Sequence, residues 1–205
     1  TPNKGVNTDT ISVTIIGANF QEGARVKLVR QNQADIDGIN TQMLCSTTIT
    51  TTFDLTEAKT GKWDVVVTNP DSQVETLTNA FKVTMDHIKP GSVTKGRITI
   101  IIPPGAFLQN YCPSINLDPL NTPERITPAA ITAVNKKEHV RNCIPDLMFE
   151  INVYDDEQII GTSSLPCSPT IIISYPDINQ DGIVDGTGIK EEGLSIFTLN
   201  EDDVK

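Results

Sequence analysis

Apolar and polar residues alternate with a period of two along most of this chain, and helical periodicity is almost absent. The alternating runs are rich in Thr, Val and Ile, and turn-forming Gly, Asn, Asp and Pro bound them. These runs lie at 11–16, 24–30, 47–53, 63–68, 97–102, 147–154, 170–175 and 194–199. Short strands at such spacing predict an all-β chain made of β-sandwiches. One turn of helix at 55–59 is the sole helical expectation.

One side of each predicted strand in the first 84 residues would face a common core. The inward positions are Val13, Ile15, Val26, Leu28, Ile49, Trp63, Val65 and Val67. Trp63 is the single Trp and should be the largest side chain in this core. Cys45 is in phase with Ile49 and Phe53, so we expect an inward-facing, reduced thiol.

The strand signal lapses near 84–92, where His, Lys, Pro and Gly suggest a stiff connector. The sequence therefore predicts two tandem β-sandwich domains, at 1–84 and 92–205, joined by a linker at 85–91. The Pro-rich stretch 113–128 cannot be a central strand, because Pro lacks the backbone donor that a ladder needs.

The 205 residues carry a formal net charge of −10, which argues against nucleic acid as a partner. No run approaches the roughly 18 apolar residues of a spanning helix, so direct membrane insertion is not expected. The chain opens on Thr1 and Pro2 without a leader, and we therefore expect a mature or excised segment.

Four cysteines are present, at 45, 112, 143 and 167, and none forms a C-x-x-C pair. An even count in an acidic β-rich chain fits an oxidising compartment, although buried free thiols remain an alternative. A disulfide within the second domain, preferably Cys112–Cys143, would contribute about 3–4 kcal/mol by closing a loop of roughly 30 residues.

The first 83 residues carry an ordered set of motifs. These are P-N-K-G (Pro2–Gly5), G-A-N-F (Gly17–Phe20), E-G-A-R-V (Glu22–Val26), F-D-L-T (Phe53–Thr56), G-K-W-D-V-V-V-T-N-P-D (Gly61–Asp71) and A-F-K-V (Ala80–Val83). In this order and spacing the segment resembles the immunoglobulin-like TIG (IPT) domain of cell-surface proteins. Gly17 and Gly23 flank a turn where we expect positive φ angles.

The second half resembles a ZU-five-like β-sandwich of bacterial surface proteins. The resemblance rests on I-I-P-P-G-A-F (Ile101–Phe107), P-T-I-I-I-S-Y (Pro169–Tyr175) and L-S-I-F-T-L-N-E (Leu194–Glu201). That family continues with further strands, so the resemblance implies a domain truncated at its C-terminal end. Its open edge at 194–199 would accept a strand from another chain.

Residues 177–185 read D-I-N-Q-D-G-I-V-D, a spacing typical of loops that bind Ca²⁺. The predicted ligands are the side chains of Asp177, Asn179, Asp181 and Asp185 and the carbonyl of Ile183. Position 12 of the loop is Gly188 rather than a bidentate Glu, and Glu191 or Glu192 would have to substitute. A turn of Asp, Asn and Gly without any metal is the alternative.

Catalytic motifs are missing from the sequence, and His87 and His139 are the only histidines, so we expect no enzyme. The leading prediction is a calcium-stabilised structural or adhesive segment of a secreted or cell-surface protein, in a bacterial or archaeal envelope. Its partners would be other domains or subunits of that envelope assembly. The alternative is a ligand- or carbohydrate-binding module of an extracellular enzyme or complex, with Tyr111, Tyr154 or Tyr175 in an aromatic groove.

Overall fold

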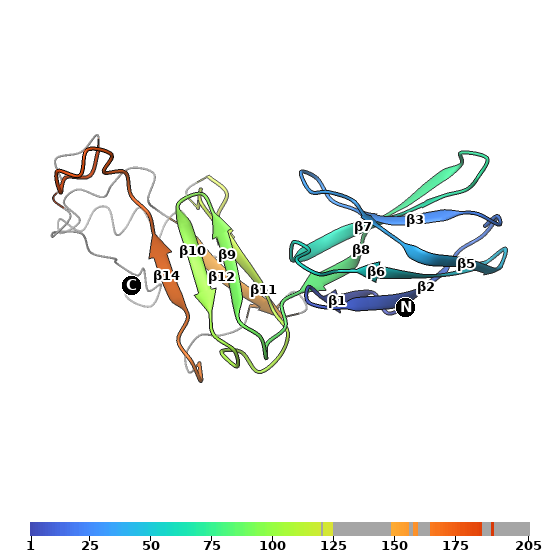
Figure 1. The fold of residues 1–205 in the computed structure, drawn as a ribbon, viewed down its shortest axis with the longest axis horizontal. Coiled ribbons are helices and arrows are strands. Elements are labelled where there is room, and N and C mark those ends of the chain that lie inside the picture. Colours follow the sequence, from blue (N-terminus) through green and yellow to red (C-terminus); the bar gives the residue numbers. More distant parts are fainter. Residues whose placement is uncertain (120, 125–148, 156–157, 160–164, 186–189, 191–205) are drawn as a thin grey trace.

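The structure is a computed structural model and describes residues 1–119, 121–124, 149–155, 158–159, 165–185 and 190. Within these residues every regular element is a β-strand and the strands form sandwich-like layers (Figure 1), which confirms the predicted all-β class. No helix that could cross a membrane occurs in the part of the chain so described.

Residues 1–84, the first half, form two facing sheets with strand orders β1-β8-β7-β3-β4 and β2-β6-β5. β1 runs parallel to β8, and the other neighbours are antiparallel. The strands are β1 (Lys4–Val6), β2 (Thr10–Ile16), β3 (Arg25–Val29), β4 (Ile36–Asp37), β5 (Ile39–Cys45), β6 (Thr48–Asp54), β7 (Gly61–Thr68) and β8 (Val74–Thr84).

The first hydrophobic core lies between these two sheets and follows the predicted alternation. All eight predicted inward positions are buried in it or pack against it. Trp63 is 2% exposed, as expected, and its indole N–H donates to the Lys59 carbonyl at 2.9 Å. The Arg30 guanidinium lies 6.0 Å from the ring centroid, so the largest core side chain also meets a cation at its margin.

Two local expectations in this half are wrong. Residues 55–58 form a β-turn in which the Ala58 N–H donates to the Leu55 carbonyl, and Glu57 adopts a positive φ of 62°, so no helical turn forms. Gly23 has the expected positive φ of 85°, but Gly17 does not. A Cβ on Gly17 would lie 2.6 Å from the Phe20 ring, so close approach rather than backbone conformation requires glycine there.

Cys45 is exposed rather than inward. The period-two phase does not continue through the hairpin turn that joins β5 to β6, and the register shifts between Met43 and Cys45. Met43 therefore packs against the core, opposite Ile49, while Cys45 faces solvent.

The described strands after residue 84 form two three-stranded sheets, β14-β10-β9 and β11-β12-β13. We call this part the second half. Its strands are β9 (Gly91–Lys95), β10 (Ile98–Ile102), β11 (Cys112–Asn116), β12 (Glu150–Asp155), β13 (Gln158–Ile159) and β14 (Thr170–Ile173). Three predicted strands are confirmed by β10, β12 and β14, while the one at 194–199 lies outside the described residues, as does its proposed open edge.

A second hydrophobic core lies in this half, and no residue belongs to both cores. Its buried members are Met85, Ile98, Ile100, Ile102, Ala106, Phe107, Tyr111, Ile115 and Val153. Pro113 lies in β11, at the edge of its sheet as far as the structure describes it, in keeping with the missing backbone donor of Pro.

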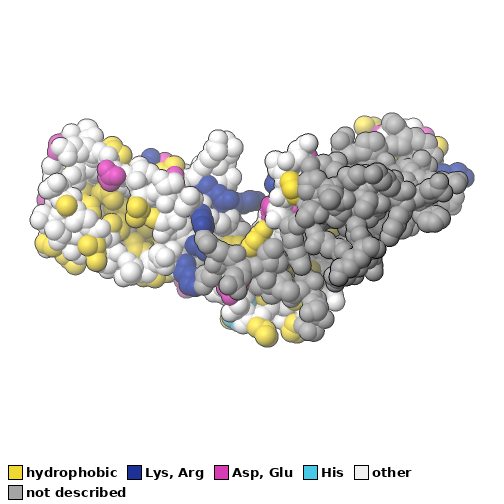
Figure 2. Space-filling view, turned by 180° about the vertical axis from the view of Figure 1, so that it is seen from behind, with side chains coloured by type: hydrophobic (Ala, Val, Ile, Leu, Met, Phe, Trp, Pro, Cys, Tyr) yellow, Lys and Arg dark blue, Asp and Glu magenta, His cyan; other side chains and the backbone are white. Residues whose placement is uncertain are grey.

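The surface of the first half is uneven in character. Figure 2 shows hydrophobic side chains gathered over one face of it. Exposed apolar residues of this half include Ile16 and Leu44 in one sheet and Leu77 in the other. Register places Lys4 beside Lys82 and Lys82 beside Lys62 across three neighbouring strands. A row of basic residues therefore crosses β1, β8 and β7, in a chain that is acidic as a whole.

Candidate metal centre

The predicted metal loop begins at Asp177, shortly after β14 ends at Ile173, and is closed at its base by hydrogen bonds. The Asp185 N–H donates to the Pro176 carbonyl at 2.8 Å, and the Ile178 N–H donates to Asp185 Oδ2 at 3.0 Å. Val184 is buried and Ile178 is exposed, so the loop is anchored at its end while its tip faces solvent. Figure 1 shows the loop at the end of the second half that lies away from the first.

Inside the loop, side-chain oxygens accept backbone N–H groups in series. Asp177 accepts from Asp181 at 3.2 Å and from Gly182 at 3.3 Å, and Asn179 Oδ1 accepts from Asp181 at 3.3 Å. Asp181 Oδ1 accepts from Ile183 at 2.8 Å. Gln180 and Gly182 take positive φ angles of 56° and 75°, which wrap the backbone around these oxygens.

The loop therefore brings three of the predicted ligand side chains into one hydrogen-bonded group. The Asn179 amide also donates to Asp181 Oδ2 at 2.9 Å. The fourth, Asp185, closes the loop base instead, and among the described residues no three His, Cys, Asp or Glu side chains meet closely enough to hold a metal. Gly188, Glu191 and Glu192 lie outside those residues.

A polar layer on one face of β11 and β12 was not predicted from the sequence. Asn116, Glu150 and Asn152 are all at least 93% buried. Glu150 Oε2 accepts the Glu124 N–H at 2.9 Å, while the Glu124 carboxylate accepts from Ser114, Asn152 and Tyr154. Burial, with the hydrogen bond to Glu124, raises the pKa of Tyr154 to about 12. The polar alternation of E-I-N-V-Y at 150–154 was the available signal.

The three tyrosines of the alternative prediction lie in different surroundings. Tyr111 is 1% exposed and its ring packs on Phe107, with centroids 4.6 Å apart. The Tyr154 hydroxyl donates to Glu124 Oε2 at 2.8 Å. Tyr175, which precedes the metal loop in the chain, is 37% exposed. Tyr111 therefore cannot serve as a sugar-stacking surface, and the alternative prediction stays a prediction for Tyr154 and Tyr175.

The structure describes only one of the two cysteines in the preferred disulfide. Cys112 is buried on β11, and its Sγ lies 3.3 Å from the Val83 carbonyl. Its preferred partner, Cys143, lies outside the described residues, so the pairing stays a prediction.

These features define the class of the chain: an all-β, sandwich-like protein with two cores and an acidic, hydrogen-bonded loop after its last described strand. Comparison of the sequence with protein-family models and with curated proteins found no match in either case.

Proposed function

We propose that this chain is a non-catalytic structural or adhesive segment of a secreted or cell-surface protein, stabilised by Ca²⁺ bound in the 177–185 loop. The TIG-like and ZU-five-like assignments, with domains at 1–84 and 92–205, belong to this proposal. So does the bacterial or archaeal envelope as its location, with other domains or subunits of that envelope as partners.

The observation that carries the proposal is the ordering of the loop oxygens. Asp177, Asn179 and Asp181 already accept the backbone N–H groups of residues 181–183, so their side chains are held on the inner side of one tight turn. Each carboxylate oxygen keeps further lone pairs for a cation. Hard oxygen donors in this spacing suit Ca²⁺, which accepts six to eight of them in flexible geometry.

The chemistry of the loop favours a cation over a bare turn. Three carboxylates within nine residues repel one another, and a divalent cation relieves that repulsion. The carbonyl of Ile183 and the side chain of Asp185 would add further oxygens, and Glu191 or Glu192 would take the place of the ligand that Gly188 cannot supply. Ca²⁺ fits better than Mg²⁺, which demands near-ideal octahedral geometry and releases its waters reluctantly.

The environment of His87 supports the non-catalytic part of the proposal. Its ring Nδ1 lies 2.8 Å from Asn110 Oδ1, so the imidazole is engaged with an amide rather than with a nucleophile. His139 lies outside the described residues.

Thermal unfolding in Ca²⁺ and in chelator tests the metal site. Binding stabilises the folded state by RT ln(1 + [Ca²⁺]/Kd), about 2.7 kcal/mol at a hundredfold excess over Kd. For a domain of this size we expect Tm to rise by roughly 10 °C in Ca²⁺. Asp181→Asn keeps an oxygen for the Ile183 N–H but removes a charged ligand, so it should lose most of the rise.

The matched control is Asp118→Asn, because Asp118 also accepts a backbone N–H in a turn of the second half, at 3.4 Å from Asn121. This variant should keep the full response to Ca²⁺. Identical melts of the unaltered protein in Ca²⁺ and chelator, or an Asp181→Asn response equal to that of Asp118→Asn, would reject the site.

A further inference from the structure

We infer that the segment between the two halves is a fixed joint that holds them at one angle, rather than a flexible linker. The joint comprises residues 83–87 together with Gly105 and residues 110–112. It goes beyond the proposed function, since it needs no metal and the calcium loop lies at the other end of the second half (Figure 1).

The backbone passes from one half to the other at Thr84 and Met85, with no residue between them. The Asn7 N–H donates to the Thr84 carbonyl at 2.9 Å, which anchors Thr84 to the first half. The next residue, Met85, donates to the Tyr111 carbonyl at 2.7 Å and accepts from the Tyr111 N–H at 3.2 Å. Met85 is 7% exposed and belongs to the second core. Adjacent residues are therefore built into different halves.

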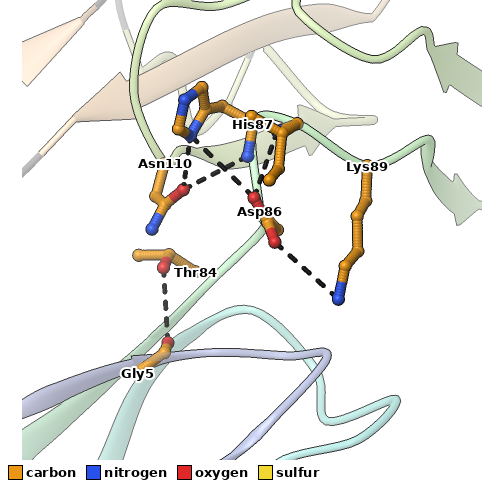
Figure 3. A network of polar contacts seen from close by, with 7 residues as sticks. Gly5, Thr84, Asp86, His87, Lys89 and Asn110 are labelled. Atoms are coloured by element: carbon orange, nitrogen blue, oxygen red, sulfur yellow. Dashed lines mark hydrogen bonds and ion pairs between the residues drawn. The ribbon is translucent and has the colours of Figure 1, made fainter.

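Side chains reinforce both sides of this crossing. Thr84 Oγ1 donates to the Gly5 carbonyl at 3.3 Å (Figure 3), and the Cys112 thiol lies 3.3 Å from the Val83 carbonyl. The second of these contacts joins β11 directly to the end of β8. Contacts from both halves thus converge on three consecutive residues.

The following turn is pinned by Asn110, as Figure 3 shows. Asn110 Oδ1 accepts the His87 N–H at 3.2 Å and lies 2.8 Å from His87 Nδ1, while the Gly105 N–H donates to the His87 carbonyl at 2.7 Å. A backbone N–H can only donate, so the amide oxygen must face His87 and Nδ1 must carry a proton. This bond persists in both charge states of the imidazole.

The described surfaces of the two halves that face each other are mainly polar. Between them lies a groove of about 310 Å³ lined mainly by polar residues, among them Lys4, Gln109 and Asp155, and the two cores share no residue. Domains that meet through a small polar interface normally move against each other. The hydrogen bonds of the joint are what would oppose that motion.

Residual dipolar couplings and amide exchange of the full chain test the joint. We expect one alignment tensor for both halves, with slow exchange at Met85 and Tyr111. Asn110→Ala removes the acceptor of two His87 donors. Hydrogen exchange at the Met85 and Tyr111 amides should then accelerate about tenfold, and the alignment tensors of the two halves should diverge. Asn121→Ala, on an exposed turn of the second half, is the matched control and should change neither.

A second variant keeps the test decisive if Asn110→Ala fails to fold. A Gly-Ser-Gly insertion between Thr84 and Met85 adds slack without removing a side chain, and it should also separate the tensors. Two tensors in the unaltered protein, or one tensor retained after the insertion, would overturn the inference, as would an Asn110→Ala variant that exchanges like Asn121→Ala. Chelation of Ca²⁺ should leave the joint intact, so its failure and that of the metal site are distinguishable.

Discussion

Thr47 and Thr48 surround the Cys45 thiol at the tip of the β5–β6 hairpin, and they alter its acidity. The thiol lies 3.2 Å from Thr47 Oγ1. Hydrogen bonds from Thr47 and Thr48 to the thiolate lower the pKa of Cys45 to about 7. Because Cys45 is exposed, an effect on stability would be small, but its reactivity should follow this pKa.

We predict that alkylation of Cys45 by iodoacetamide rises steeply as the pH passes about 7, since the thiolate is the reactive form and replaces the thiol there. Thr47→Val removes the nearest hydroxyl and should move the midpoint of the rate profile to higher pH. Peptide-resolved mass spectrometry separates Cys45 from the other cysteines. Thr76→Val, on exposed β8, should leave the profile unchanged; equal profiles for all three proteins would contradict the assigned cause.

At the scale of elements, β4 is a two-residue strand that depends on Gly38. The Gly38 N–H donates to the Val26 carbonyl at 2.8 Å, where the chain turns from β4 into β5. A Cβ on Gly38 would lie 2.9 Å from that same carbonyl oxygen, which belongs to the backbone and cannot swing aside. The same Cβ would come still closer to Thr51 Oγ1, so Gly38 lies tightly between β3 of one sheet and β6 of the other.

Gly38→Ala should therefore destabilise the first half by about 1–3 kcal/mol, the usual cost of forcing atoms into a packed site. Urea unfolding followed by Trp63 fluorescence measures this, because Trp63 lies in the first core. The neighbouring exposed position provides the comparison: Asp37→Ala should change stability by less than about 0.5 kcal/mol. Equal urea midpoints for the two variants would show that the backbones can separate with little loss in the free energy of unfolding.

At the scale of the whole molecule, two separate cores joined through polar contacts imply two largely independent unfolding events. Each half buries its own apolar residues, whereas the described contacts that cross from one half to the other at the joint are hydrogen bonds, each worth about 1 kcal/mol net. The joint sets orientation, and the cores set stability.

We therefore predict that Ca²⁺ shifts only one of two urea transitions. Trp63 fluorescence reports the first half and its midpoint should barely move, while far-UV circular dichroism should show a second transition that moves with Ca²⁺. Asp181→Asn should hold that second transition at its chelator position. A Trp63 midpoint that follows Ca²⁺ as strongly as the second transition would mean that the halves unfold as one unit.

The amino-acid sequence alone predicts the all-β class and most inward positions of the first core, because a period of two is a local property of each strand. Val26, Leu28 and Trp63 are buried as their alternation predicts. It also determined the spacing of Asp177, Asn179 and Asp181, and a nine-residue turn can bring these together without distant contacts.

Features that depend on partners far apart in the chain could be seen only in the folded protein. The outward turn of Cys45 follows from the register between β5 and β6, and the burial of Glu150 follows from Glu124 and β11. Residues 85–87 read as a connector, yet they are fixed by residues 105–111, some twenty positions away. Alternation says which side a residue takes on its own strand, but not which strand or loop meets that side.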